Sequence, residues 1–179
     1  MQRPLVVLAV VAAVAAALVG SAQPWTGPGT RAAAATRSGF LLLPPAAPAG
    51  QMVLYGHVKG LRRTGGGYLL RFDPAWFTSG LTASRAKLED TGSSDVPNDN
   101  YVVEEGHRTL TYRLPATARV TVLTNQGTRG IAATRVPVAE LARIVNGGPH
   151  RKLFEPLASG VWIRVRVDTV LELDQQYQP

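Results

Sequence analysis

The chain has 179 residues, a formal net charge of +7 and no cysteine. The lack of cysteine excludes disulfides, thiolate zinc sites, a cysteine nucleophile and lipid attachment through an N-terminal cysteine. Apart from three lysines the cationic side chains are all arginines, which together with the abundant Ala and Gly indicates the codon bias of a GC-rich genome.

The N-terminus has the three parts of a secretory signal. Arg3 precedes an apolar run from Leu5 to Val19, and the small residues Gly-Ser-Ala follow at 20–22. Small residues at the −3 and −1 positions are typical of a signal-peptide cleavage site. The apolar stretch of about 18 residues is also long enough for an uncleaved anchor. Residues 1–22 are therefore predicted to be a signal peptide or membrane anchor, and the protein to be extracytoplasmic, either secreted or anchored.

Residues 23–50 are rich in Pro, Gly, Ala and Thr. This composition offers too little apolar surface to offset the cost of ordering the chain, so it predicts a flexible linker. Its exception is the apolar patch Phe40–Leu43, which could dock on the folded domain or on a membrane surface. Residues 51–179 are predicted to form a single β-rich domain of about 130 residues, enough to bury a core without disulfides.

Alternating apolar residues predict the strands of this domain. Residues 53–57 begin a strand, Thr-Gly-Gly-Gly at 64–67 supplies a turn, and residues 68–72 run back, which is typical of a β-hairpin. The residues at 73–77, Asp-Pro-Ala-Trp-Phe, are predicted to close this strand and lead into a helix, with the two aromatic rings in the core. Further strands are predicted at residues 110–114, 120–122 and 161–173.

Two short helices interrupt the strands. The first is predicted from about Leu81 to Asp90, with Gly92 beyond its end, and the second from about Pro137 to Asn146, followed by two glycines. Mostly antiparallel strands with two peripheral helices predict a mainly β fold, either a small barrel or a strongly curved antiparallel sheet. The alternative is an α+β sandwich.

Five segments of the domain resemble a group of uncharacterised secreted proteins from actinobacteria. The resemblance covers roughly residues 51–179 and implies a location in the cell envelope, and it carries no known activity, ligand or site. The segments are RFDPAWF at 71–77, VPNDNYVV at 96–103, LTYR at 110–113, VPVAEL at 136–141 and DQQYQP at 174–179.

Motifs for nucleophilic, phosphate-binding and zinc chemistry are missing from the sequence, and no cofactor is predicted. The residues that could transfer protons are His57, Asp73 and His107. A catalytic interpretation pairs one of the two histidines with the aspartate. The alternative is that all three are ordinary polar surface residues.

The polar loop after the first helix gathers hard oxygen donors, which are the ligands that Ca²⁺ prefers. It lacks the Asp-x-Asp-x-Asp-Gly spacing of a calcium loop, and Asn and Asp also form turns through their own backbone. The prediction for this loop is therefore turn formation without a metal, and a calcium site is the alternative. The donors are Glu89, Asp90, Asp95, Asn98 and Asp99.

Four arginines alternate with apolar residues on three of the predicted strands: Arg71, Arg113, Arg164 and Arg166. If these strands are neighbours, the arginines form one basic stripe that could bind an anionic wall polymer or a membrane surface. The sequence carries no specific signal for nucleic acid, and its partners are otherwise unknown.

These observations leave the function open and favour a non-enzymatic, exported binding or accessory module of the cell envelope. One alternative is an extracytoplasmic hydrolase whose site is assembled across the fold, where sequence spacing does not reveal it. The other is a weak binder of anionic polymer or lipid through the arginine stripe.

Overall fold

The computed structural model describes residues 46–106 and 108–178, all within one compact unit of residues 36–179. The predicted signal or anchor, nearly all of the predicted linker with Phe40–Leu43, and His107 lie outside the described residues. Among the helices that the structure describes, none is long and apolar enough to cross a membrane.

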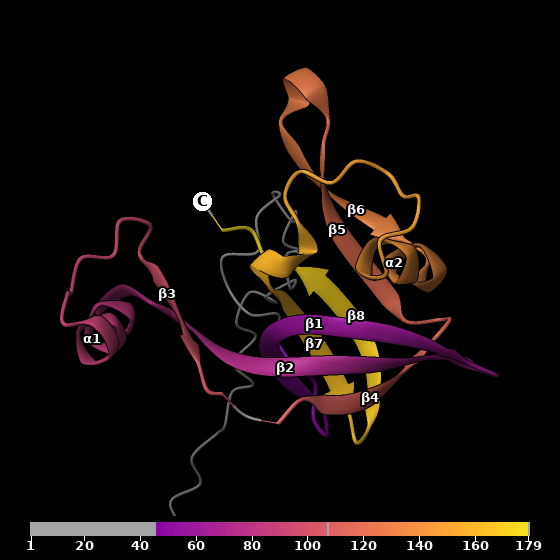
Figure 1. Cartoon of the computed structure of the whole chain (residues 1–179), viewed down its shortest axis with the longest axis horizontal. Helices are drawn as coiled ribbons and strands as arrows, with labels where there is room; N and C mark the ends of the chain where they lie inside the picture. The colour runs from indigo at the N-terminus through magenta and orange to yellow at the C-terminus, as the bar shows by residue number, and fades with distance from the viewer. Residues whose placement is uncertain (1–45, 107, 179) are drawn as a thin grey trace, which may run out of the picture. The chain divides into compact units, whose positions relative to one another are not determined.

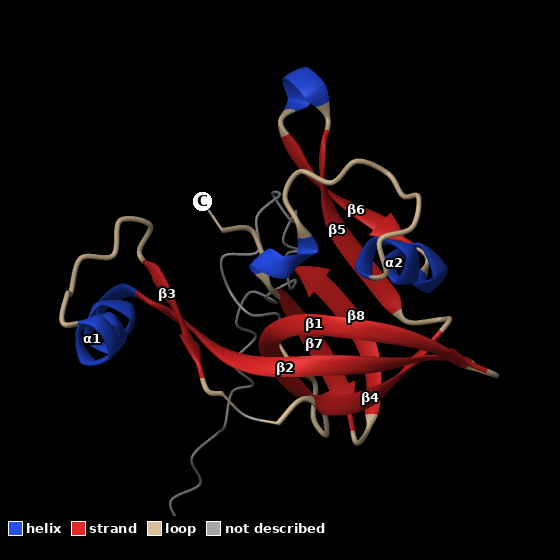
Figure 2. Ribbon diagram, viewed as in Figure 1, coloured by secondary structure: helices blue, strands red, loops and turns tan. Residues whose placement is uncertain are grey.

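The described residues form eight strands, two α-helices and two short 3₁₀ helices (Figures 1 and 2). The strands are β1 (Met52–Thr64), β2 (Gly67–Ser79), β3 (Asn100–Glu104), β4 (Leu110–Pro115), β5 (Arg119–Asn125), β6 (Ile131–Val136), β7 (Val161–Arg166) and β8 (Thr169–Gln175). The helices are α1 (Gly80–Thr91), α2 (Val138–Val145), η1 (Gly127–Arg129) and η2 (Leu157–Ser159).

The strands form one mixed, ring-like sheet in the order β3-β2-β1-β7-β8-β5-β6. Strand β4 lies off this path and pairs with both β2 and β8, which links β1, β2, β4, β8 and β7 into a ring. Its contact with β8 is a single residue pair, Arg113 with Thr169, so the sheet is ring-like but not a barrel. The predicted mainly β fold with two short helices is confirmed, with parallel β4–β8 and β5–β8 pairs in place of a wholly antiparallel sheet.

The main core lies on the inner face of the ring. Alternate residues of β2 and β7, such as Phe72, Ile163 and Val165, are fully buried there. Helix α2 adds the fully buried Leu141 from its apolar stripe, while its Glu140 binds Arg151. The strict alternation in the sequence therefore does mark the inner face of the sheet.

Residues 161–173 were predicted to be one strand, and this is wrong. The chain turns at Val167 and Asp168, and β8 runs back antiparallel to β7. Val167 has a positive φ of 57°, which is uncommon for a β-branched residue. Because the turn lacks the Gly, Pro or Asn that usually marks one, and alternation continues on both sides of it, the sequence pattern does not reveal it.

The predicted end of the second strand at residues 73–77 is also wrong. Strand β2 continues through Pro74 to Ser79, and Trp76 is 62% exposed rather than part of the core. The helix that follows is confirmed, since α1 ends at Thr91 and Gly92 caps it in the left-handed conformation, with the Gly92 N–H donating to the carbonyl of Leu88. Strands β3 and β6 were not predicted from the sequence.

Candidate functional site

Strands β1 and β2 separate at one end of their hairpin. They pair from the turn as far as Tyr55 and Ala75. Beyond that point the start of β1, residues 52–54, pairs with β7, and the end of β2, residues 76–79, pairs with β3 (Figure 1). Because each strand follows a different partner, a gap opens between the two strands beyond this point.

A pocket of about 550 Å³ lies in this gap, which we call the aromatic wedge. Its lining is almost entirely apolar, and Glu105 is the charged residue among the described residues that line it. The lining side chains used below are Val53, Tyr55, Trp76, Phe77, Glu105 and Trp162.

Three rings form a second, smaller hydrophobic cluster beneath the wedge. The ring centroid of Tyr55 lies 5.0 Å from that of Trp162 and 5.2 Å from that of Phe77, and the last two are 5.8 Å apart. Tilted and edge-to-face contacts at these distances are favourable for aromatic pairs. Tyr55 and Trp162 are buried, whereas Trp76 at the mouth of the pocket is exposed. The wedge thus has a fixed aromatic floor and one accessible indole.

Hydrogen bonds with η2 and with the C-terminal segment hold Tyr55 in place. The Tyr55 hydroxyl donates to the carbonyl of Ser159 at 2.9 Å and accepts from Nε2 of Gln178 at 2.7 Å. Burial raises the pKa of Tyr55 to about 12; the nearby Glu104 and Glu155 act in the same direction, and the hydrogen bond from Gln178 opposes it. The phenol therefore stays neutral at physiological pH.

Gly160 allows Tyr55 to take this position. Its φ is +120°, and a Cβ at this residue would lie 2.1 Å from the Tyr55 hydroxyl oxygen. No side chain can occupy that space, so the glycine is required both by its backbone conformation and by the close approach of the ring.

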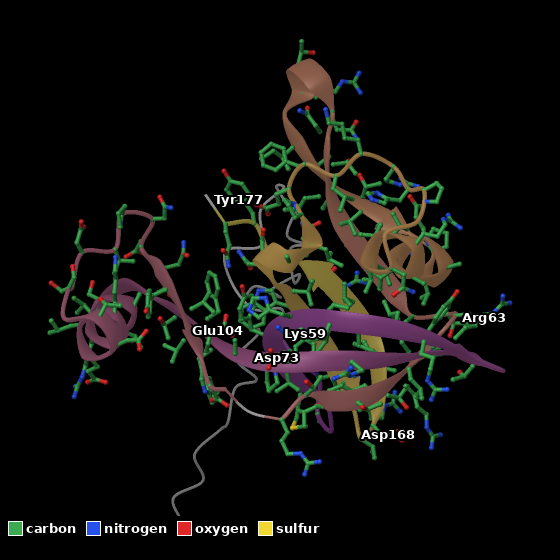
Figure 3. The ribbon with its side chains drawn as sticks, in the orientation of Figure 1. Lys59, Arg63, Asp73, Glu104, Asp168 and Tyr177 are labelled. Carbon is green, nitrogen blue, oxygen red and sulfur yellow. The ribbon has the colours of Figure 1, made fainter. Side chains whose placement is uncertain are left out.

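The structure gives His57 and Asp73 different side-chain partners. They lie opposite each other in the register of β1 and β2, but Asp73 Oδ2 is 2.9 Å from Nζ of Lys59. The His57 Nδ1 lies 3.0 Å from the carbonyl of Ala158, and its Nε2 lies 2.8 Å from Oε1 of Glu104. Figure 3 shows Lys59, Asp73 and Glu104 in the same part of the molecule. With both ring nitrogens engaged, His57 has none free to accept a proton from a ligand.

Two side chains and two backbone carbonyls of the acidic loop accept hydrogen bonds or ion pairs from neighbouring residues. Glu89 binds Arg85 at 2.9 Å, and a carboxylate oxygen of Asp90 accepts from the Tyr101 hydroxyl. The backbone carbonyl of Asp95 accepts from Lys87, that of Asn98 from Asn100, and Asp99 has a positive φ of 55°. In the part of the chain that the structure describes, no three His, Cys, Asp or Glu residues are placed to hold a metal.

The four arginines of the predicted stripe fall into two groups. Arg166 and Arg113 both pair with Thr169 in the sheet register, and Arg71 lies two residues along β2 from the partner of Arg113. These three are exposed. The Arg164 side chain is only 13% exposed because it binds Glu172 at 2.7 Å, next to Arg119.

An ion pair further reduces the net positive charge of the predicted basic stripe. Arg113 Nε lies 3.1 Å from Oδ2 of Asp168 in the β7–β8 turn (Figure 3). The strand register thus brings Arg71, Arg113 and Arg166 close together. One carboxylate, that of Asp168, offsets part of their charge.

Comparisons with protein-family models, curated proteins and solved structures find no match for this chain. Its function therefore has to be argued from the site itself. The aromatic wedge was not predicted from the sequence. A signal for it was present in the large aromatic residues Tyr55, Phe77 and Trp162. Tyr55 and Trp162 occupy outward positions of predicted strands, where polar side chains are expected.

Proposed function

We propose that the chain is a non-enzymatic binding module of the cell envelope and that the aromatic wedge is its binding site. The proposal is carried by one observation, the exposed Trp76 at the mouth of an apolar pocket whose aromatic floor is locked in place. Ligand pockets are typically concave and mostly apolar, with few polar groups. The N-terminal signal pattern supports a location outside the cytoplasm.

The ligand group that fits the wedge is apolar. Aromatic and aliphatic side chains line it, so a hydrocarbon or aromatic moiety gains burial there without leaving polar groups unsatisfied. The engaged nitrogens of His57 support binding rather than proton transfer.

The experiment uses the neutral apolar fluorophore N-phenyl-1-naphthylamine. In the full chain carrying Trp25→Phe, the remaining tryptophans are Trp76 and Trp162, and both line the wedge. Saturable binding with energy transfer from tryptophan is expected, and Trp76→Ala should weaken it at least about tenfold, as expected for an aromatic side chain that becomes buried against the ligand.

The matched control is Leu81→Ala, which removes a 90% exposed apolar side chain from α1, outside the wedge. This variant should bind as the parent does. Equal weakening by both substitutions would show nonspecific binding and contradict the proposal.

The neighbouring Arg71, Arg113 and Arg166 favour a second activity, weak binding of anionic polymer or lipid. Because exposed charges are screened over about 8 Å at physiological ionic strength, this binding should depend strongly on salt. In vesicle sedimentation, Arg71→Gln with Arg166→Gln should reduce binding to anionic vesicles at low salt. Equal binding to neutral vesicles, or an unchanged double variant, excludes it.

A further inference from the structure

The described part of the chain begins beside the aromatic wedge. Ala46 and Ala47 are its first two residues, and both line the pocket. The apolar patch Phe40–Leu43 lies outside the described residues, but only two prolines separate it from Ala46. Three residues of fully extended chain span at most about 11 Å, so the Cα of Leu43 can be no farther than this from the Cα of Ala46. The covalent chain therefore keeps an apolar segment close to an apolar pocket.

The sequence of Phe40–Leu43 favours burial in an extended conformation. It consists of four large apolar side chains without a charge, in a stretch that is otherwise rich in Pro, Gly, Ala and Thr. Apolar side chains of this kind gain free energy when they leave water. The residue before a proline is disfavoured in the helical region, so Pro44 favours an extended backbone at Leu43.

The aromatic wedge offers such a segment backbone partners as well as apolar ones. Beyond Tyr55 and Ala75, β1 pairs with β7 and β2 pairs with β3. The edges that face the gap, at residues 52–54 and 76–79, have no strand partner in the described part of the chain, and none of its backbone hydrogen bonds outside the ladders reaches them. Unpaired N–H and C=O groups of a strand edge can bind an extended segment.

We infer that Phe40–Leu43 is an intramolecular plug of the aromatic wedge, with its backbone along the edge of β2 and its side chains against the aromatic floor. The edge at residues 76–79 is as long as the segment, and its Phe77 belongs to the floor. The inference rests on the proposed function, since it names the group that a ligand has to displace from the same site.

The short connection makes the plug effective even if its contacts are weak. A short flexible tether gives an effective concentration of the order of millimolar, without any need for a second molecule. The predicted cleavage after residue 22 leaves the plug attached to the domain. An apolar ligand therefore binds in competition with the plug, and its apparent affinity is reduced by the fraction of molecules in which the wedge is open.

The plug variant is Leu41→Ser with Leu42→Ser, in the full chain carrying Trp25→Phe. Because the competitor is weakened, it should bind N-phenyl-1-naphthylamine about three- to tenfold more tightly than the parent does. The matched control is Leu81→Ser with Leu88→Ser, which removes two leucines from α1 that are 90% and 50% exposed and lie outside the wedge. This control should bind as the parent does.

Hydrogen exchange gives a second measurement that needs no ligand. Amides of residues 76–79 that do not bond to β3 should exchange faster in the plug variant, because they lose their partner, and at the parental rate in the control. Unchanged exchange in the plug variant overturns the plug. Protection that rises with protein concentration would assign the wedge to the segment of a second copy, which also overturns an intramolecular plug.

The plug and the proposed function fail separately. If naphthylamine binding depends on Trp76, an unchanged or weaker affinity in the plug variant overturns the plug and leaves the proposed function standing. If Trp76→Ala does not weaken this binding, the proposed function is contradicted, and the exchange comparison alone decides whether the plug exists.

Discussion

The indole N–H of Trp162 donates to the side-chain oxygen of Gln176 at 2.6 Å, and both side chains are buried. The glutamine is fixed in turn, because its backbone N–H donates to the carbonyl of Gly160 at 3.0 Å. The floor of the aromatic wedge therefore depends on a residue outside the pocket, contributed by the segment that follows β8.

Gln176→Leu should lower the free energy of unfolding by about 1–3 kcal/mol, since it leaves a buried indole N–H without an acceptor. Urea denaturation measures the loss. The control is Trp162→Phe, which removes the donor. The double variant should lose less than the sum of the single losses, and strict additivity would contradict the coupling.

Gly160→Ala should destabilise the protein by about 1–3 kcal/mol, because it forces a strained φ and displaces the Tyr55 ring. Gly60→Ala is the matched control, since no atom lies within 4 Å of a Cβ there and its φ is not positive. Thermal unfolding should separate the two variants, and near-UV circular dichroism should show an altered aromatic environment only in Gly160→Ala. Similar melting temperatures would show that Tyr55 can move at little cost.

Substitutions on either side of Arg166 should have opposite effects. Val165 is fully buried, and Val165→Asp places an unpaired charge in the core, which should cost more than about 4 kcal/mol. Val167 is 86% exposed with a positive φ, so Val167→Asn should stabilise the turn by about 0.5–1 kcal/mol. A destabilised Val167→Asn would show that the turn does not favour this backbone conformation.

Arg151→Gln should change how stability depends on pH. The two hydrogen bonds from Arg151 to Glu140, at 2.5 and 2.9 Å, lower the pKa of that carboxyl below its usual value, although its burial opposes the shift. A lowered pKa in the folded state means that the pair stabilises the fold above the ordinary glutamate range. That contribution is lost as the pH falls through the lowered pKa.

Urea unfolding from pH 7 down to pH 2 measures this effect. The wild type should be the more stable protein at neutral pH, and the two curves should converge in acid. A stability difference that persists at pH 2 would assign the role of Arg151 to packing.

Local signals were sufficient for part of the fold. The glycine run at 65–67 marks the turn between β1 and β2, and Gly92 marks the end of α1, where its positive φ provides the left-handed cap. Strand β3 was missed because Tyr101, Val102 and Val103 are too few for a periodic pattern and follow a polar loop. The turn at Val167 was missed because it contains no Gly, Pro or Asn and its first residue is β-branched.

The candidate site depends on long-range pairing instead. The aromatic wedge exists because β1 leaves β2 to pair with β7, in register pairs such as Met52 with Val165. His57 finds Glu104 through the β2–β3 pairing, and no spacing in the sequence connects these two residues. The aromatic residues were visible in the sequence, but their common pocket depended on strand partners far away along the chain.

The position of β1 between β2 and β7 also has a consequence for folding kinetics. The β1–β2 hairpin closes a short loop, so it can form early. The β1–β7 pairing and the parallel contacts of β8 join residues far apart in the chain, and the entropy of closing such loops opposes them until several strands are in place. Sheets dominated by nonlocal pairs fold on the order of milliseconds to seconds. The aromatic wedge should therefore be among the last parts of the molecule to form.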